Sequence, residues 1–228
     1  MKKIAFPLRL LSAFVCLLFI VALLFSSVRI IINRSAFFYS EYARLGHARL
    51  MGMNTEDLTN ATMQMVRYME GSAKSIDLEV TVNGERVSMF NDRERAHMVD
   101  VLLLYQNWRT FSYLAFGLFV VLVVLLRKNL GGLARAFLNA SKVFVLLLAA
   151  VALWVLFDFS SFWTAFHHLF FTNDLWLLDP ATSRMINMMP LQLFYDIVLS
   201  VVVLFIVFWG TILAAALILR RREKRASV

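Results

Sequence analysis

Four long apolar runs, separated by polar segments, limit what this chain can fold into more than any other feature. They cover residues 10–32, 111–126, 143–157 and 197–219. A helix needs about 20 apolar residues to cross the roughly 30 Å hydrocarbon core of a bilayer. The third run is shorter, but aromatic residues continue it. Because a chain in lipid must satisfy its own backbone hydrogen bonds, the runs predict four membrane-spanning helices.

The composition agrees with a membrane protein. Hydrophobic residues fill 61% of the 228 positions, and the mean hydropathy is +0.71. A soluble domain averages roughly 45–50% apolar residues, so the excess is expected to face lipid. The single cysteine, Cys16, excludes an intramolecular disulfide bond.

Basic residues gather in three polar segments, which are residues 1–9, 127–142 and 220–228. These segments hold 12 basic residues and one acidic residue, Glu223, whereas the rest of the chain has 11 basic and 14 acidic residues. The positive-inside rule therefore places all three segments, and both termini, in the cytoplasm of a multi-pass plasma-membrane protein. The basic tail is also suited to contact anionic lipid. Nucleic-acid binding is the weaker interpretation, because membrane topology already accounts for the charge.

The first run follows Lys2 and Lys3, as the apolar part of a secretory signal peptide would. Its apolar stretch is longer than such a segment needs, and no small-x-small cleavage site follows it. We therefore expect an uncleaved anchor helix.

The predicted organisation alternates spans with polar segments, and the two outer segments are long enough to fold. The predicted boundaries are 10–32 for the first span, 33–110 for an extracytoplasmic cap, 111–126 for the second span, 127–142 for a cytoplasmic loop, 143–157 for the third span, 158–196 for a second extracytoplasmic segment, 197–219 for the fourth span and 220–228 for the basic tail.

Local signals predict two helices in the cap. Asn54 or Thr55 is placed to cap a helix that stops at Gly71. Asn91 with Glu94 resembles a capping box, so a helix should start at residue 92 and continue into the second span.

A β-hairpin is predicted between these helices, over about residues 76–89. Apolar and polar residues alternate over residues 76–82, and Asn83-Gly84 then supplies a two-residue turn. Two strands alone are marginal in water, so the hairpin must lie on the cap helix or on the bilayer surface. The expected fold class is mainly α, a four-transmembrane-helix bundle with a small extracytoplasmic α+β cap.

The side chains best suited to chemistry lie in the two outer segments. All four histidines are expected there: His47, His97, His167 and His168. Glu94, His97 and Asp100 are spaced i, i+3 and i+6, so that neighbours share a helix face. A carboxylate beside an imidazole can hold its tautomer. The alternative is that Glu94 only caps the helix and that Asp100 is solvated.

The residues alone leave the chemistry open. His167 and His168 are adjacent and point about 100° apart, so they are not expected to share one role. Two imidazoles among Phe and Trp side chains suit a lipid ester, and with Asp158 or Asp174 they would equally suit a metal ion. The sequence contains no HExxH, GxSxG, GxGxxG or P-loop motif.

Two histidine motifs taken together resemble a family of bacterial four-span membrane proteins, the lipoprotein intramolecular transacylases. The motifs are Glu94-x-x-His97-Met98-x-Asp100-Val101 and Phe166-His167-x-x-Phe170-Phe171, followed by Asn173, Trp176 and Met189-Pro190. The resemblance covers nearly the whole chain. It implies an enzyme that moves the sn-2 acyl chain of a diacylglyceryl lipoprotein to the α-amine of the N-terminal cysteine of that lipoprotein, giving an N-acylated lyso-form product.

The resemblance also implies the site. Its catalytic histidines match His97 and His167, with His168 as an extra neighbour that leaves open which of the pair acts. Glu94 or Asp100 would orient His97. The expected pocket side chains, whose alternative role is anchoring at the membrane interface, are Trp163, His168, Phe170, Phe171 and Trp176. Because the substrate carries its own amine nucleophile, no catalytic Ser or Cys, no cofactor and no metal is expected.

Two other functional classes compete with the enzyme. A non-enzymatic assembly factor or sensor, with a partner-binding cap, would tolerate His97→Ala and His167→Ala, whereas the enzyme would lose turnover. A transporter is poorly supported, because the spans contain almost no ionisable residue to mark a substrate path. The oligomeric state is not predicted.

Overall fold

The computed structural model describes residues 6–225, which form two compact units. The bundle unit consists of the described parts of Met1–Ser27 and Val202–Val228, together with Arg109–Trp163. The α/β unit consists of Val28–Trp108 and Thr164–Val201. Lys2 and Lys3 of the predicted cytoplasmic N-terminus, and residues 226–228 of the predicted tail, lie outside the described residues.

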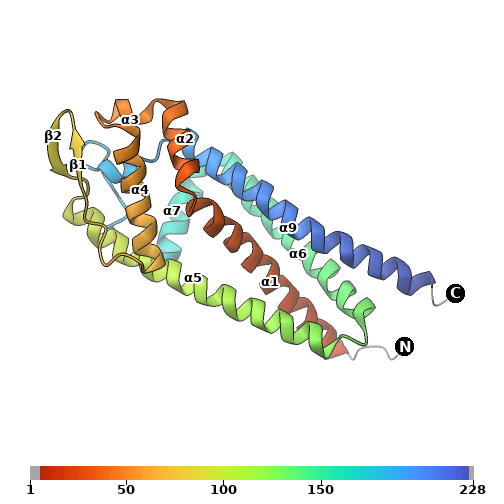
Figure 1. The fold of residues 1–228 in the computed structure, drawn as a ribbon. Coiled ribbons are helices and arrows are strands. Elements are labelled where there is room, and N and C mark those ends of the chain that lie inside the picture. The colour runs from red at the N-terminus through yellow and green to blue at the C-terminus, as the bar shows by residue number, and fades with distance from the viewer. Residues whose placement is uncertain (1–5, 226–228) are drawn as a thin grey trace. The chain divides into compact units, whose positions relative to one another are not determined.

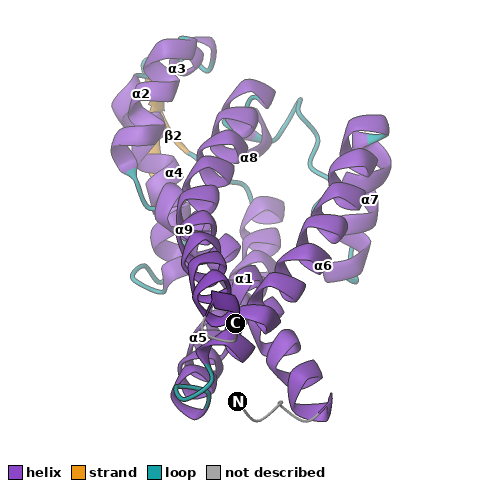
Figure 2. Ribbon diagram, turned by 90° about the vertical axis from the view of Figure 1, so that its right-hand side faces the viewer, coloured by secondary structure: helices purple, strands orange, loops and turns teal. Residues whose placement is uncertain are grey.

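Helices dominate both units, and the strands pair in one hairpin (Figures 1 and 2). In chain order the elements are α1 (Phe6–Ile32), α2 (Ser35–Leu45), α3 (His47–Leu50), α4 (Thr55–Glu70), β1 (Glu79–Val82), β2 (Glu85–Ser88), α5 (Asp92–Leu125), α6 (Leu130–Phe157), α7 (Phe159–Phe170), α8 (Arg184–Asn187) and α9 (Leu191–Arg225). Helices α1, α5, α7 and α9 each contribute residues to both units.

Four helices in the described chain are long and apolar enough to cross a membrane. Their candidate spans are Pro7–Ile32, Asp92–Leu125, Leu130–Phe157 and Leu191–Glu223. With the two-stranded hairpin, they confirm the predicted fold class of four membrane helices and a small β element.

The third of these helices begins earlier than its apolar run. Helix α6 starts at Leu130, so most of the segment expected to be a loop, residues 127–142, is helical. The Asn129 side chain caps this start by accepting a hydrogen bond from the Gly132 backbone N–H at 3.0 Å. The capped start and the good helix formers that follow Gly132 extend the helix beyond the length that hydropathy predicts.

Aromatic contacts and small residues pack the core of the bundle unit. The ring of Phe19 on α1 stacks on Phe119 of α5, with centroids 3.8 Å apart. The Trp209 indole of α9 donates a hydrogen bond to Ser141 of α6 at 3.1 Å. Buried alanines on α6 let neighbouring side chains approach closely, as is common between helices in lipid; these are Ala134, Ala136 and Ala140.

One acidic residue joins the start of α6 to the end of α9. Glu223 accepts hydrogen bonds from Arg135 at 3.0 Å and from Arg220 at 2.9 Å. A Cβ atom on Gly131 would lie 2.3 Å from the carboxyl carbon of Glu223. A side chain at position 131 would therefore displace the Glu223 carboxylate from this contact.

A separate apolar core holds the α/β unit together, and a buried tyrosine lies within it. The Tyr42 hydroxyl is 2.7 Å from the Thr62 hydroxyl on α4 and donates to the Met188 carbonyl at 3.1 Å. The flexible side chains of methionine fill much of this core; those that are buried include Met53, Met65, Met89, Met98, Met185 and Met188.

The predicted caps of α4 appear as expected. The Asn54 side chain accepts a hydrogen bond from the Asp57 backbone N–H at 2.7 Å. At the other end, Gly71 takes a left-handed conformation with φ of 81°. Residues without this freedom are strained there, so the chain leaves the helix at a defined point.

The hairpin also forms at the predicted turn, with Val80 paired to Val87. Asn83 and Gly84 both have positive φ, 52° and 89°, as a type I′ turn requires. Val80 is buried in the core of the α/β unit, and the Asn83 N–H donates to the Gly52 carbonyl at 2.8 Å. The hairpin is therefore supported by the packed core of its own unit.

Glu70, the last residue of α4, ties together three helices of the α/β unit. Its carboxylate accepts hydrogen bonds from Arg29 at 2.7 and 2.8 Å, from Asn33 at 3.0 Å and from the Tyr105 hydroxyl. Burial raises the pKa of this carboxyl, but the donors from Arg29, Tyr105 and Asn33 outweigh burial and hold the pKa at about 2.

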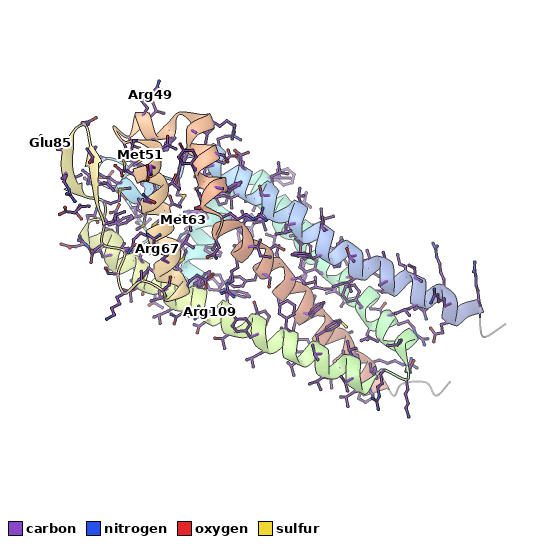
Figure 3. All side chains as sticks on the ribbon, in the orientation of Figure 1. Arg49, Met51, Met63, Arg67, Glu85 and Arg109 are labelled. Atoms are coloured by element: carbon purple, nitrogen blue, oxygen red, sulfur yellow. The ribbon has the colours of Figure 1, made fainter. Side chains whose placement is uncertain are left out.

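We expect Glu70→Gln to lower the free energy of unfolding by about 1–3 kcal/mol, because charged hydrogen bonds are lost. Thermal unfolding of the detergent-solubilised protein, followed by tryptophan fluorescence, measures the change. Glu85→Gln is the control, since Glu85 projects from the hairpin into solvent (Figure 3). The folded-state pKa lies below the ordinary value of 4.5, so the parent keeps this stabilisation above pH 4.5 and loses it as the pH falls toward 2. Equal melting temperatures for the two variants would contradict this role of Glu70.

Candidate active site

Two histidines from distant parts of the chain lie against the same phenyl ring. The ring centroid of Phe171 is 5.4 Å from that of His97, on α5, and 5.7 Å from that of His167, on α7. The two imidazole centroids therefore cannot be further apart than these two distances added together. The α/β unit therefore brings together the two histidines that the sequence singled out.

Aromatic rings shield His167 from water, and His97 is half-buried. His167 stacks on Trp176, with ring centroids 4.5 Å apart and planes at 28°. Exposed fractions are only 6% for His167, 7% for Phe171 and 9% for Trp176. Polar interactions are strengthened in such a desolvated environment.

Two polar atoms in this cluster are buried without a hydrogen-bond partner among the described residues. They are Nδ1 of His97 and Nε1 of Trp176. Buried polar atoms in proteins are nearly always paired, so an unpaired one calls for an explanation such as a bound molecule. Both atoms are thus available to a polar group of a substrate.

Glu94 is bonded to the backbone and to a serine, and not to His97. Its carboxylate accepts hydrogen bonds from the Asn91 N–H at 2.7 Å, the Ser183 hydroxyl at 2.5 Å and the Met185 N–H at 2.7 Å. The first of these completes the predicted capping box, and the other two hold the N-terminal end of α8. These contacts support the capping alternative over an orienting role toward His97.

Asp100 fixes the loop that carries Trp176. Its carboxylate accepts a hydrogen bond from the Asn173 side chain at 2.9 Å, and Asn173 in turn accepts one from the Leu175 N–H at 3.0 Å. The charge of Asp100 also acts on His97. Sequence spacing did not indicate these contacts of Asn173 and Ser183, because their partners Asp100 and Glu94 are more than 70 residues away.

The remaining predicted pocket residues divide between the two units. His168 is exposed, with its ring edge-on to Trp176 at 5.5 Å, whereas the adjacent His167 is buried. Phe170 contacts Trp108 at a centroid distance of 6.5 Å. Trp163 belongs to the bundle unit, where its ring stacks on Phe159 at 5.7 Å.

The metal alternative requires a cluster of ligands. Within residues 6–225, no group of three or more His, Cys, Asp or Glu side chains is placed to hold a metal ion. The described site is therefore a pair of imidazoles in an aromatic surround, with a carboxylate nearby.

Comparison with known proteins identifies the family. A model of the lipoprotein intramolecular transacylase family, Lit, matches residues 13–194. The chain belongs to the Lit family. It is therefore a membrane-integral acyltransferase of a lipoprotein transacylase family, as the resemblance implied. No curated protein sequence gives a match.

Solved structures of Lit from Bacillus cereus share the fold of this Lit-family chain. One has a TM-score of 0.77 at 18% identity and covers 96% of this chain and 99% of its own. Two others carry a substitution of one histidine, by arginine or by alanine. Their TM-scores are 0.74 and 0.68, at 19% and 17% identity; they cover 97% and 94% of this chain, and 96% of each of their own chains.

In this Lit-family chain, we expect Glu94→Gln to lower the free energy of unfolding by about 1–3 kcal/mol. The amide nitrogen would face donors that now bond to a carboxylate oxygen. Melting temperature and turnover should be measured together, with exposed Glu85→Gln as the control. A variant that loses turnover but melts like the parent would instead support an orienting role toward His97.

Proposed function

We propose that this protein transfers the sn-2 acyl chain of a diacylglyceryl lipoprotein to the α-amine of its N-terminal cysteine. The observation that carries the proposal is that both His97 and His167 contact the buried ring of Phe171. An N–C bond forms, the ester C–O bond breaks, and the amine proton ends on the sn-2 oxygen. The product is an N-acyl lyso-form lipoprotein.

The attacking amine must lose a proton, and a neutral imidazole is a suitable base near pH 7. We assign this role to His167, and we assign the role of hydrogen-bond donor and proton shuttle to His97. The unpaired Nδ1 of His97 supports a bond to the reacting ester. The oxyanion of the tetrahedral intermediate needs such a donor, and Nε1 of Trp176 is a second candidate.

Holding amine and ester together supplies much of the expected rate enhancement. Both groups belong to one substrate, so the protein needs mainly to orient them and to exclude water. The buried rings of Phe171 and Trp176 are suited to exclude water, which would otherwise hydrolyse the ester. This scheme uses no nucleophile from the protein.

We expect His97→Ala and His167→Ala each to lower turnover by about 10²–10⁴, the usual contribution of acid–base catalysis. Exposed His168→Ala is the matched control and should keep most of the activity. The assay uses purified protein in mixed micelles with a diacylglyceryl lipopeptide, and mass spectrometry locates the transferred acyl chain. Parent-like melting temperatures exclude misfolding. If both alanine variants convert the lipopeptide at the parent rate, the proposed chemistry is wrong.

We further propose that both termini are cytoplasmic and that residues 33–110 and 158–196 are outside. The excess of basic residues in the three segments assigned to the cytoplasm supports this orientation. The proposed site residues His97 and His167 would then act at the outer face.

Cysteine labelling tests this orientation, because the native Cys16 is buried. We expect Glu85→Cys to react with a membrane-impermeant maleimide in intact cells, and Lys128→Cys to react only after the cells are opened. Both positions are exposed in the structure. The opposite labelling pattern would place the site in the cytoplasm.

A further inference from the structure

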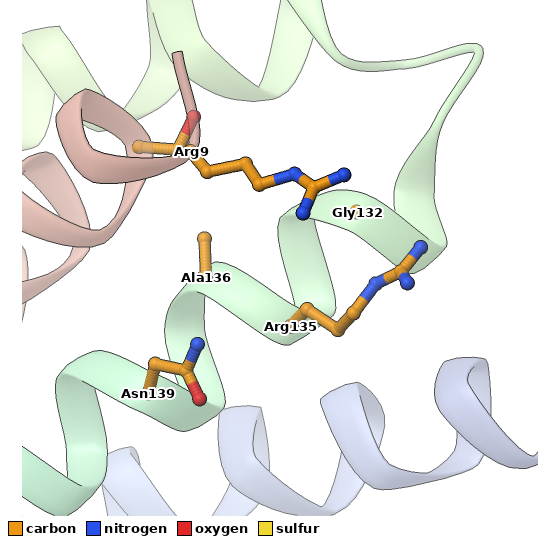
Figure 4. A pocket seen from close by; sticks show the side chains of 6 residues that line it. Arg9, Gly132, Arg135, Ala136 and Asn139 are labelled. Carbon is orange, nitrogen blue, oxygen red and sulfur yellow. The ribbon is translucent and has the colours of Figure 1, made fainter. Parts of the chain in front are cut away.

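A cavity of about 140 Å³ opens in the bundle unit between α1 and α6. Its lining residues are Arg9, Ser12, Gly132, Arg135, Ala136 and Asn139. Figure 4 shows the Arg9 side chain reaching from α1 toward Gly132 in the first turn of α6, with Arg135 and Asn139 on α6. About 10–15 Å³ suffices for one water molecule, so the cavity has room for a phosphate group.

The charge around this cavity is positive. In the sequence segments that form the bundle unit, the acidic side chains are Asp158, beyond the far end of α6, and Glu223. Glu223 binds both Arg135 and Arg220, so one carboxylate is shared between two guanidinium groups. Arg9 and Arg135 both line the cavity, so two guanidinium groups border it. Arginine presents paired N–H donors that match the oxygens of a phosphate.

The cavity lies where the polar end of the helices meets their apolar length. Arg9 directly precedes the uncharged stretch that begins the first apolar run. Leu10 and Leu11 on α1 and Val143 on α6 lie further along their helices than Arg9 and Arg135, and they leave 58%, 56% and 47% of their surfaces exposed. Both helices are candidate membrane spans, so these side chains are suited to contact acyl chains and the arginines are suited to contact headgroups.

We propose that this cavity binds the phosphate of an acidic phospholipid, with Arg9, Arg135 and Asn139 as donors. The excess of guanidinium groups favours a headgroup with net negative charge over a zwitterionic one. Basic pockets between membrane helices commonly hold such headgroups. The bound lipid links α1 to α6. This inference depends on neither the transacylation chemistry nor the orientation of the termini.

The test uses the full chain, purified in a neutral detergent without lipid. Phosphatidylglycerol, phosphatidylcholine and inorganic phosphate are added separately. Native mass spectrometry measures binding, and thermal unfolding measures stabilisation, since a ligand that binds the folded state raises the melting temperature. We expect binding and stabilisation with phosphatidylglycerol, and at least tenfold weaker binding of phosphatidylcholine.

Arg9→Gln should weaken phosphatidylglycerol binding at least tenfold, whereas Lys128→Gln should leave it unchanged. Lys128 is an exposed basic residue of the α5–α6 turn that does not line the cavity. Asn139→Leu is the second variant, for use if Arg9→Gln does not yield folded protein; it removes a donor without changing charge.

Three results would overturn the proposal. In one, phosphatidylglycerol binds the cavity variant as tightly as the parent. In another, Lys128→Gln weakens binding to the same extent, which would indicate a general attraction to the basic end of the unit. In the third, inorganic phosphate at equal concentration stabilises the protein as much as the lipid does, which would identify a site for a soluble anion.

Discussion

Glu94 accepts three hydrogen bonds at a position that is 1% exposed, and the arrangement of the histidine site depends on these bonds. One bond fixes the start of α5, which begins five residues before His97. The others fix Ser183 and Met185, nearly 90 residues further along the chain. An unpaired carboxylate here would be costly, so its donors and the segments that carry them are confined to one arrangement. Asp100 acts similarly on the loop with Trp176, through Asn173.

The contacts of Glu94 distinguish a catalytic role from a capping role, which sequence spacing alone cannot do. A Glu-x-x-His pair on a helix can serve catalysis or can cap the helix, and in this structure Glu94 caps it. The imidazoles instead pack on aromatic rings, which bury His167 and contact the half-buried His97 through Phe171. That environment suits a reaction in which the substrate supplies the nucleophile and water must be excluded.

Much of the architecture was predictable because its causes are local. The apolar runs gave four candidate membrane helices, the Asn54 and Gly71 caps delimited α4, and Asn83-Gly84 set the hairpin turn. The start of α6 was not predicted, because hydropathy indicates which residues can lie in the bilayer but does not indicate where a helix begins. The support beneath the hairpin was also open, since burial of Val80 depends on contacts with the core of the α/β unit.

The sequence by itself determined the membrane class and the fold class, because hydropathy and turn chemistry depend on neighbouring residues; it also singled out the two histidines as candidates through the paired histidine motifs. Only the tertiary structure decided that His97 and His167 meet at Phe171, that Glu94 binds Ser183, and that Arg9 and Arg135 share a cavity. Each of these contacts joins residues more than 60 positions apart. Such contacts are set by the packing of whole helices, so no local pattern encodes them.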